Sequence, residues 1–226
     1  MMNKKIKIIN LEMRKDRKLY IETQLAKLNI NPESYDFFKA INGRQIPVTR
    51  ELYDLFGSKK NNYVPKKMEI GCTMSHLNLW ISLIHDQIND YYIILEDDIL
   101  FTNDFKEKLE YCCREFENKK MHYLLIGALT IYTLNTDLSS LSITHRELEF
   151  NEGTHGYIID KNACIAILNF FKNQSIYLPI DNASIYNHIF DKKVFSVNEV
   201  LVIQKHGSTD IQNSVEIFDF SEFENK

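Results

Sequence analysis

Apolar residues recur along the chain in two patterns that alternate with each other. Short runs such as KIKII at residues 5–9 and YYIIL at 91–95 predict strands, and the second run is apolar throughout, which is typical of a strand buried on both faces of a parallel sheet. Other segments carry apolar residues at intervals of three and four, which predicts amphipathic helices. Strands that alternate with helices in this way predict an α/β fold, with helices flanking a mostly parallel central sheet.

Helix boundaries follow from turn and capping residues. One helix begins at Arg17 and ends between Asn29 and Pro32, a second opens near Thr73, and a third begins after Asn103, which is a good N-cap. Their expected buried residues are Leu19, Ile21, Leu25 and Leu28, then Leu77, Trp80, Ile81, Ile84 and Ile88, then Phe105, Leu109, Cys112, Cys113 and Phe116. A fourth helix carries Cys164, Leu168 and Phe171, and further strands are expected within 34–40, 122–126, 153–160 and 194–204.

The length of the chain favours one domain. The 226 residues, 44% of them hydrophobic, can bury a substantial core, and no internal repeat or low-complexity tract divides them. We therefore expect a single domain over residues 1–226. Residues 48–67, which include GSKKNNYVPKK, are the best candidate for a mobile loop or lid, and residues 212–226 are expected to form a C-terminal tail.

Charge and cysteine content exclude several classes. A net charge of -4 gives no general attraction to nucleic acid phosphates. The four cysteines form no CxxC pair, and we interpret them as small buried hydrophobes in a reducing compartment. The N-terminus does not read as a signal peptide, and no apolar run is long enough to span a membrane. These features predict a soluble cytoplasmic protein, at most in peripheral contact with the inner face of the plasma membrane.

Three adjacent carboxylates, Glu96, Asp97 and Asp98, directly follow the apolar strand YYIIL. In open α/β sheets, ligands bind beyond the carboxyl ends of the strands. Two like charges about 4 Å apart repel by roughly 4 kcal/mol at an effective dielectric near 20, so such a cluster should bind a cation or raise a pKa. Oxygen ligands favour Mg²⁺ or Mn²⁺ together with a substrate diphosphate. The alternative is that these acids cap the next segment and face water.

Four weaker motifs accompany this cluster. EIGCTMSHLNLW places Ser75 and His76 at the start of the predicted helix, where an anion can bind, although a plain N-cap explains these residues equally well. In GTHGYII, two glycines around His155 allow a ligand to approach the backbone, or serve a tight turn. The last two motifs are LPIDNA, with Asp181 after a proline, and QKHGSTD, with His206 after the final strand.

Together and in this order, the segments resemble a known family. A strand followed by NLEMRKDR, then EIGCTMSH, ILEDD, GTHGY, PID and a closing strand before Gln204, is similar to glycosyltransferase family 25, the lipopolysaccharide-type β-galactosyltransferases, which collagen galactosyltransferases also resemble. The likeness covers about residues 4–210. It implies a GT-A-like fold, a UDP-sugar donor (usually UDP-galactose), Mn²⁺ or Mg²⁺, inversion at the anomeric carbon, and a saccharide or glycolipid acceptor such as lipopolysaccharide or lipooligosaccharide.

The resemblance also implies roles for individual residues. Asp98 would be the main metal ligand, Glu96 would ligate through water, and His206 would be a third ligand to the metal or diphosphate. An inverting transfer needs a base for the acceptor hydroxyl, for which Asp181 is the candidate and Glu69 the competitor. The expected donor-binding residues are Asn10, Leu11, Arg14, Arg17, Ser75, His76, Asp97, Gly153, Thr154 and His155.

Two other classes of protein remain open at this stage. A metal-dependent phosphohydrolase or nucleotidyl enzyme could use the same carboxylates, and a non-catalytic GT-A-like module could bind a partner instead. The chain also departs from the family, because VEIFDFSEFENK at its end is acidic and aromatic where members acting on membrane glycolipids often carry a basic tail.

Overall fold

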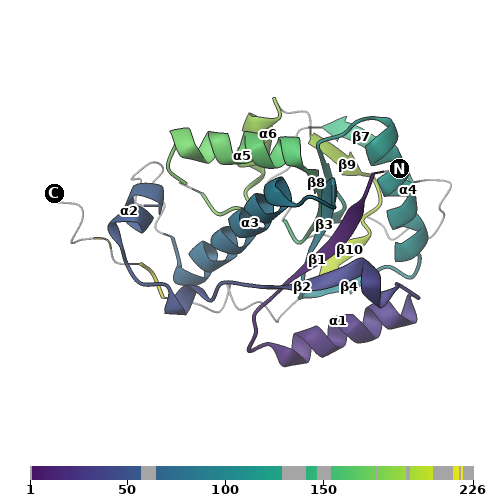
Figure 1. The fold of residues 1–226 in the computed structure, drawn as a ribbon, viewed down its shortest axis with the longest axis horizontal. Helices are drawn as coiled ribbons and strands as arrows, with labels where there is room; N and C mark the ends of the chain where they lie inside the picture. The colour runs from purple at the N-terminus through teal and green to yellow at the C-terminus, as the bar shows by residue number, and fades with distance from the viewer. Residues whose placement is uncertain are drawn as a thin grey trace.

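A computed structural model describes residues 2–56, 65–128, 141–146, 154–176, 178–191, 194–205, 216–218 and 220. Within these residues the protein forms an α/β fold with a central sheet between two layers of helices, which confirms the predicted fold class (Figure 1). Its short helical turns are η1 (Pro32–Ser34) and η2 (Gly43–Gln45).

The central sheet has the strand order β2-β1-β3-β8-β5-β9-β7 among the described residues. Five of these strands point one way, and β8 and β7 point the other way. The strand in GTHGYIID is therefore antiparallel to its neighbours, which the alternation of strands and helices does not reveal. The strands are β1 (Lys4–Asn10), β2 (Tyr35–Lys39), β3 (Tyr91–Glu96), β5 (Tyr123–Leu125), β7 (Ile143–Arg146), β8 (Gly156–Asp160) and β9 (Val194–Val197).

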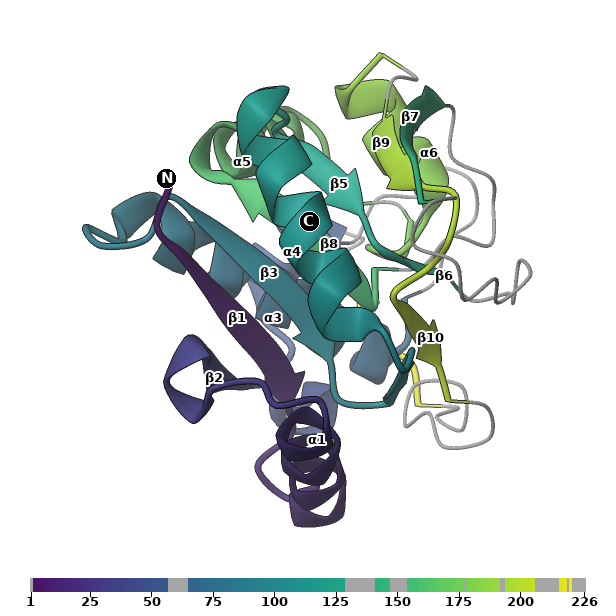
Figure 2. The same ribbon diagram turned by 90° about the vertical axis from the view of Figure 1, so that its right-hand side faces the viewer.

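Both faces of the sheet are covered by helices, as the apolar strand YYIIL predicts. On β3, Tyr92 and Ile94 pack with α3 and α5, whereas Ile93 and Leu95 pack with α1 and α4. Figure 2 looks onto the α4 side, with α3 and α5 behind the sheet. The helices are α1 (Lys15–Lys27), α2 (Arg50–Phe56), α3 (Lys67–His85), α4 (Phe105–Asn118), α5 (Lys161–Asn173) and α6 (Ala183–Ile189).

A small second sheet brings the last strand to the end of β3. Its order is β4-β10-β6, formed by β4 (Ile99–Phe101), β10 (Val202–Gln204) and β6 (Gly127–Ala128). Because Gln204 pairs with Ile99, and the Lys205 N–H donates to the Asp98 carbonyl at 2.7 Å, the end of β10 lies beside the carboxylate cluster.

Helix α3 begins at Lys67, six residues before the predicted start at Thr73. The Glu69 carboxylate accepts the Lys66 N–H at 3.0 Å and so caps the helix, although lysine gives no capping signal in the sequence. The predicted buried face of this helix is also wrong at two positions. Ile81 is exposed, and Ile88 is exposed and lies beyond the end of the helix. Helix α4 begins one residue later than expected, with Asp104 at its N-cap in place of Asn103.

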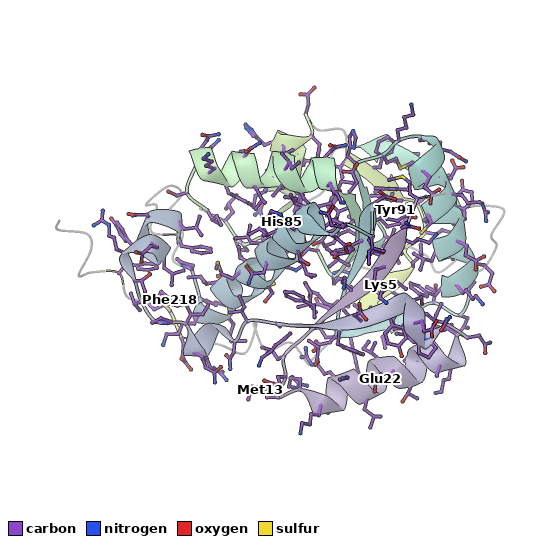
Figure 3. The ribbon with its side chains drawn as sticks, viewed as in Figure 1. Lys5, Met13, Glu22, His85, Tyr91 and Phe218 are labelled. Carbon is purple, nitrogen blue, oxygen red and sulfur yellow. The ribbon has the colours of Figure 1, made fainter. Side chains whose placement is uncertain are left out.

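Part of the predicted 48–67 loop is helical. Helix α2 places Leu52 and Phe56, four residues apart, into the core, a short apolar pair that the sequence prediction missed. Residues 57–64 lie outside the described residues. From the predicted 212–226 tail, Phe218 and Phe220 stack on each other in the same core cluster, beside α2 (Figure 3). Phe218 and Phe220 are therefore packed, whereas Glu216 and Ile217 are exposed.

Helix α3 packs on η2 through backbone atoms. A Cβ atom built on Gly71 would lie 2.6 Å from both the Gly43 nitrogen and the Ile41 oxygen. A Cβ on Gly43 would lie 1.7 Å from the Lys67 oxygen. Two glycines thus allow the first turns of α3 and the segment after β2 to touch without side chains between them.

We expect Gly71→Ala to destabilise the protein by about 1–3 kcal/mol, because backbone atoms must separate to admit the methyl group. This cost exceeds the gain of up to about 1 kcal/mol that alanine brings to a helix interior. Urea unfolding of the variant measures the difference. The matched control is Asn78→Ala at an exposed position of the same helix, which should change stability by no more than about 0.5 kcal/mol. Equal stability of wild type and Gly71→Ala would contradict the close contact.

Candidate functional site

The candidate site forms where β1 and β3 end and β8 begins. These three strands are neighbours, and the Glu96 N–H donates to the His155 carbonyl at 3.1 Å. Because β8 is antiparallel, its start lies at the same sheet edge as the ends of β1 and β3. The first turn after β1, the carboxylates after β3 and the GTHG segment before β8 therefore meet there.

Asp97 is held on both carboxylate oxygens. The Asn10 amide donates to Oδ2 at 2.6 Å, and the Arg17 guanidinium donates to Oδ1 at 2.6 Å. Burial raises the pKa of Asp97, while the charge of Arg17 and these hydrogen bonds act to lower it. Asp97 therefore ties the turn after β1 and the start of α1 to the end of β3.

Asp98 is the acid of the cluster whose negative charge is least compensated. Its side chain is only 7% exposed, and its Oδ1 atom has no hydrogen-bond partner among the described residues. Arg17 lies 3.6 Å from its other oxygen. Burial and the negative charge of Glu96 raise the pKa of Asp98 to about 7. An unpartnered buried carboxylate oxygen beside other acids fits a hard divalent cation.

Glu96 ends a directed chain of hydrogen bonds. The Trp80 indole N–H donates to the Tyr157 hydroxyl at 3.0 Å, that hydroxyl lies 2.7 Å from His76 Nδ1, and His76 Nε2 lies 3.3 Å from Glu96 Oε1. Since an indole nitrogen can only donate, the simplest pattern has Tyr157 donating to Nδ1 and Nε2–H donating to Glu96. Burial acts to raise the pKa of Glu96, but the hydrogen bond to His76 and the electrostatic effects of His76, His155 and Arg17 together outweigh it, so that pKa lies below its ordinary value.

Cys72 and Asp181 share the electrostatic environment of this cluster. Burial and then the charges of Glu96, Asp181 and Asp98 raise the pKa of the Cys72 thiol. Solvent reaches the Asp181 side chain, yet surrounding protein atoms crowd its carboxyl; this partial burial and the charge of Glu96 raise its pKa, and Glu69 adds to the effect. Asp181, Glu69 and the three consecutive acids therefore act on one another.

Two adjoining hollows lie at this edge and share Leu11 and Ile41. The first contains the acids and is lined by Ile9, Leu11, Arg17, Ile41, Met68, Cys72, Glu96, Asp97, Asp98 and Gln204. The second extends from it and is lined by Leu11, Glu12, Met13, Lys39, Ala40, Ile41, Asn42, Gln45 and Ile46. Met13, labelled in Figure 3, lies in the turn between β1 and α1.

Most of the predicted site residues that the structure describes lie close together at this sheet edge, but several of them bind other groups of the protein. Ser75 and His76 lie inside α3, so the prediction that they stand at its N-terminus is wrong. The Ser75 hydroxyl donates to the Gly71 carbonyl at 2.7 Å and accepts the Ile41 N–H at 2.8 Å. The Arg14 side chain pairs with Asp16 at 2.9 Å.

The remaining predicted residues lie in or near the GTHG and QKHG segments. Thr154 is buried, and its hydroxyl has no hydrogen-bond partner among the described residues. His155 is buried and acts to lower the pKa of Glu96, which places it near the acids. Gly153 and His206 lie outside the described residues.

Sequence reasoning missed Cys72, Ile41, Met68, Gln204 and Tyr157. The spacing of Cys72 and His76 at i and i+4 on a helix was a usable signal, because residues four apart share one helical face. Ile41, Tyr157 and Gln204 depend on chain topology, which brings β2, β8 and β10 to the same edge as β3. Met68 lies in the first turn of α3, whose start the sequence prediction missed.

Comparisons with known proteins agree on one family. A family model described as "Glycosyltransferase family 25 (LPS biosynthesis protein)" matches residues 3–184. A protein of Acanthamoeba polyphaga mimivirus, named as a glycosyltransferase, is 30% identical over 72% of this chain and 52% of its own length. A Haemophilus influenzae protein, also named as a glycosyltransferase, is 23% identical over 87% of this chain and 69% of its own. The chain thus spans about half the length of the viral relative.

A solved structure aligns with most of the chain. It is a glycosyltransferase involved in the glycosylation of the major capsid of PBCV-1, with 8% identity, a TM-score of 0.47, and coverage of 92% of this chain and 94% of its own. In the part of the chain that the structure describes, no helix has the length and apolar character needed to cross a membrane.

We expect Asp98→Asn to be more stable than wild type at pH 8 without divalent metal. The pKa of Asp98 is about 7 in the folded protein and about 4 in the unfolded chain. Ionisation of Asp98 therefore lowers the free energy of unfolding. This loss of stability is absent below about pH 4, grows between about pH 4 and pH 7, and reaches its full size above about pH 7. We expect a gain on the order of 1–4 kcal/mol at pH 8 that disappears near pH 4.

Urea unfolding in EDTA at several pH values measures this gain, with Asp54→Asn as the matched control. Asp54 forms an exposed i,i+4 ion pair with Arg50, so its loss should cost no more than about 0.5 kcal/mol. A less stable Asp98→Asn protein at pH 8 would mean that Arg17 fully compensates the Asp98 charge.

Proposed function

The chain belongs to glycosyltransferase family 25, and from this premise we propose that it transfers a sugar from a nucleotide-sugar donor to a saccharide acceptor. The observation that carries the proposal is Asp98, a buried carboxylate that lines a pocket at the sheet edge, has a raised pKa, and has one oxygen without a hydrogen-bond partner in the described part of the chain. Ionised Asp98 destabilises the folded protein, and a cationic ligand that offsets this cost best explains why the site contains it.

Asp98 and Glu96 would hold a divalent ion, for which we propose Mn²⁺ or Mg²⁺. When bound, such an ion neutralises charge on the leaving diphosphate. Arg17 extends the positive field toward the same place, because its guanidinium contacts Asp97 and lies 3.6 Å from Asp98. Asn10 and Asp97 fix the turn that borders the pocket, so that donor and carboxylates keep their relative positions.

The adjoining hollow suits the nucleoside of a UDP-sugar. Leu11 and Ile41 connect it with the acid-lined pocket, which gives a continuous path from base to diphosphate. Ala40, Ile46 and Met13 offer apolar surface to a flat ring, and the Asn42 and Gln45 amides offer hydrogen bonds to its edge. This combination of apolar walls and a few polar groups is typical of small-ligand sites.

Asp181 is our proposed general base. Its pKa is raised by partial burial and by Glu96, which makes its carboxylate a stronger proton acceptor at neutral pH. Its side chain is solvent-accessible, as an acceptor hydroxyl requires. Glu69 is the weaker candidate, because its carboxylate already accepts the Lys66 N–H at the start of α3.

The finer specificity follows from the family resemblance alone. We propose a UDP-sugar, with galactose as the first candidate, inversion at the anomeric carbon, and an acceptor of the lipopolysaccharide or lipooligosaccharide type reached in the cytoplasm. A metal-dependent phosphohydrolase would use the same carboxylates but would not need the acceptor or the sugar. The family model supports the transferase over that alternative.

We expect purified protein to release UDP slowly from one member of a panel of UDP-sugars when Mn²⁺ is present, and not in EDTA. Asp98→Asn should reduce that release by at least about 100-fold, since it removes a carboxylate from the proposed cation site. Asp54→Asn makes the same substitution in the exposed ion pair between Asp54 and Arg50 on α2, and it should release UDP as wild type does. Hydrolysis of UDP to UMP and phosphate, at a rate equal to that of UDP release from the UDP-sugar, would favour the phosphohydrolase.

We expect Asp181→Asn to lower acceptor-dependent transfer by about 10²–10⁴-fold, the usual contribution of a general base, while donor KM changes little. Glu69→Gln keeps a hydrogen-bond acceptor for the Lys66 N–H and should retain most activity. Steady-state kinetics with donor and acceptor varied separately distinguish the two. Wild-type turnover in Asp181→Asn would assign the base elsewhere.

A further inference from the structure

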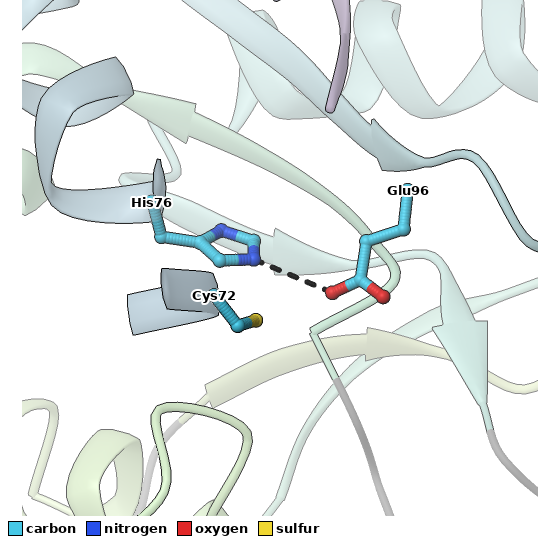
Figure 4. Close-up of side chains that lie close together, drawn as sticks. All are labelled: Cys72, His76 and Glu96. Carbon is cyan, nitrogen blue, oxygen red and sulfur yellow. Dashed lines mark hydrogen bonds and ion pairs between the residues drawn. The ribbon is translucent and has the colours of Figure 1, made fainter. Parts of the chain in front are cut away.

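A second group of possible metal ligands lies beside the carboxylate cluster. Cys72 Sγ, His76 Nε2 and a Glu96 carboxylate oxygen all lie within 4.8 Å of one another. Figure 4 shows Cys72 and His76 extending from α3 toward Glu96 at the end of β3. We propose that these three residues bind Zn²⁺ at a site distinct from the one proposed at Asp98.

The geometry requires only a small adjustment. Zinc bonds are about 2.0–2.2 Å long to nitrogen and oxygen and about 2.3 Å long to sulfur. In a tetrahedral site these lengths place the nitrogen and oxygen ligands about 3.4 Å apart, and the sulfur about 3.6 Å from each of them. His76 Nε2 and Glu96 Oε1 are already 3.3 Å apart. Only the thiol must approach, and Cys72 is a partly exposed residue that lines the acid pocket, so the pocket admits the ion and a water as fourth ligand.

The His76 ring is held by its other nitrogen. Nδ1 lies 2.7 Å from the Tyr157 hydroxyl, which also accepts the Trp80 indole N–H at 3.0 Å. Metal-binding histidines usually donate the N–H of the second ring nitrogen to such a partner, which fixes the ring orientation. Zinc binding at Nε2 therefore requires the tautomer with the proton on Nδ1, the reverse of the metal-free pattern, and Nδ1–H then donates to the Tyr157 oxygen. His76 and Tyr157 are both buried, so the ring cannot turn away into solvent.

Ligand chemistry separates the two sites. A thiolate and an imidazole select Zn²⁺, whereas the oxygens of Asp98 suit Mg²⁺ or Mn²⁺. Glu96 is common to both, so zinc bound by Cys72 and His76 withdraws Glu96 from the donor pocket. This part of the inference rests on the proposed function and makes Zn²⁺ an inhibitor of the Mn²⁺-supported reaction.

The test is titration of the metal-free protein with Co²⁺, read by the sulfur-to-cobalt charge-transfer absorbance and competed by Zn²⁺. We expect a saturable band that Cys72→Ser abolishes and that Tyr157→Phe weakens by about 10-fold in affinity. Cys112→Ser is the matched control, because Cys112 is buried in α4, in the core cluster on the other face of the sheet, and it should retain the band. Circular dichroism of each variant verifies folding.

The two proposals fail in different ways. Absence of the band in folded wild type, or its persistence in Cys72→Ser, overturns the zinc site whatever the enzyme does. Asp98→Asn should keep the band even though it loses UDP release. In wild type, Zn²⁺ should inhibit Mn²⁺-dependent UDP release, and Cys72→Ser should be less sensitive by at least about 10-fold; equal sensitivity would overturn the inhibitory role.

Discussion

The mutual repulsion of three consecutive carboxylates at the end of a buried strand governs this edge of the molecule. Each acid is accommodated differently. Asp97 is held by hydrogen bonds from Arg17 and Asn10, and Glu96 is held by the buried His76. Asp98 has a raised pKa, and one of its oxygens has no hydrogen-bond partner among the described residues. The charge of Asp98 is therefore the one of these charges at which we propose a cation.

This division explains why residues from distant parts of the chain are buried together. Arg17 lies in the first turn of α1, and its bond to Asp97 connects that helix with the end of β3. His76 lies within α3, and its partner Tyr157 belongs to β8. Buried polar side chains of this kind are costly unless they are paired. Their pairing with the acids therefore fixes the first turn, α3 and β8 around the pocket.

Local sequence signals identified most of the strands and the acid cluster, because apolar runs and adjacent charges are properties of neighbouring residues. The short strands β4, β6 and β7 were missed. The start of α3 was missed, because it depends on the Glu69 carboxylate and on contact with Gly43 rather than on a capping residue. The direction of β8 depends on its partners in the sheet, and so does the hydrogen bond that brings Tyr157 to His76. Arg17 was predicted to bind the donor from the turn after β1; the structure places it in the first turn of α1, where it contacts Asp97, and the donor role stays a prediction. The position of Gln204 required knowledge of the second sheet.

The contact between Gly71 and the segment around Gly43 has a consequence for how donor specificity can change. Ile41 and Asn42 line the second hollow, and Cys72, next to Gly71, lines the acid-containing hollow. The Ser75 hydroxyl accepts the Ile41 N–H and so connects α3 to this segment. The spacing of these two walls is fixed by main-chain atoms in contact. Side chains on the walls can therefore be exchanged, in evolution or by engineering, to alter which groups a ligand meets, while the width available to that ligand stays constant.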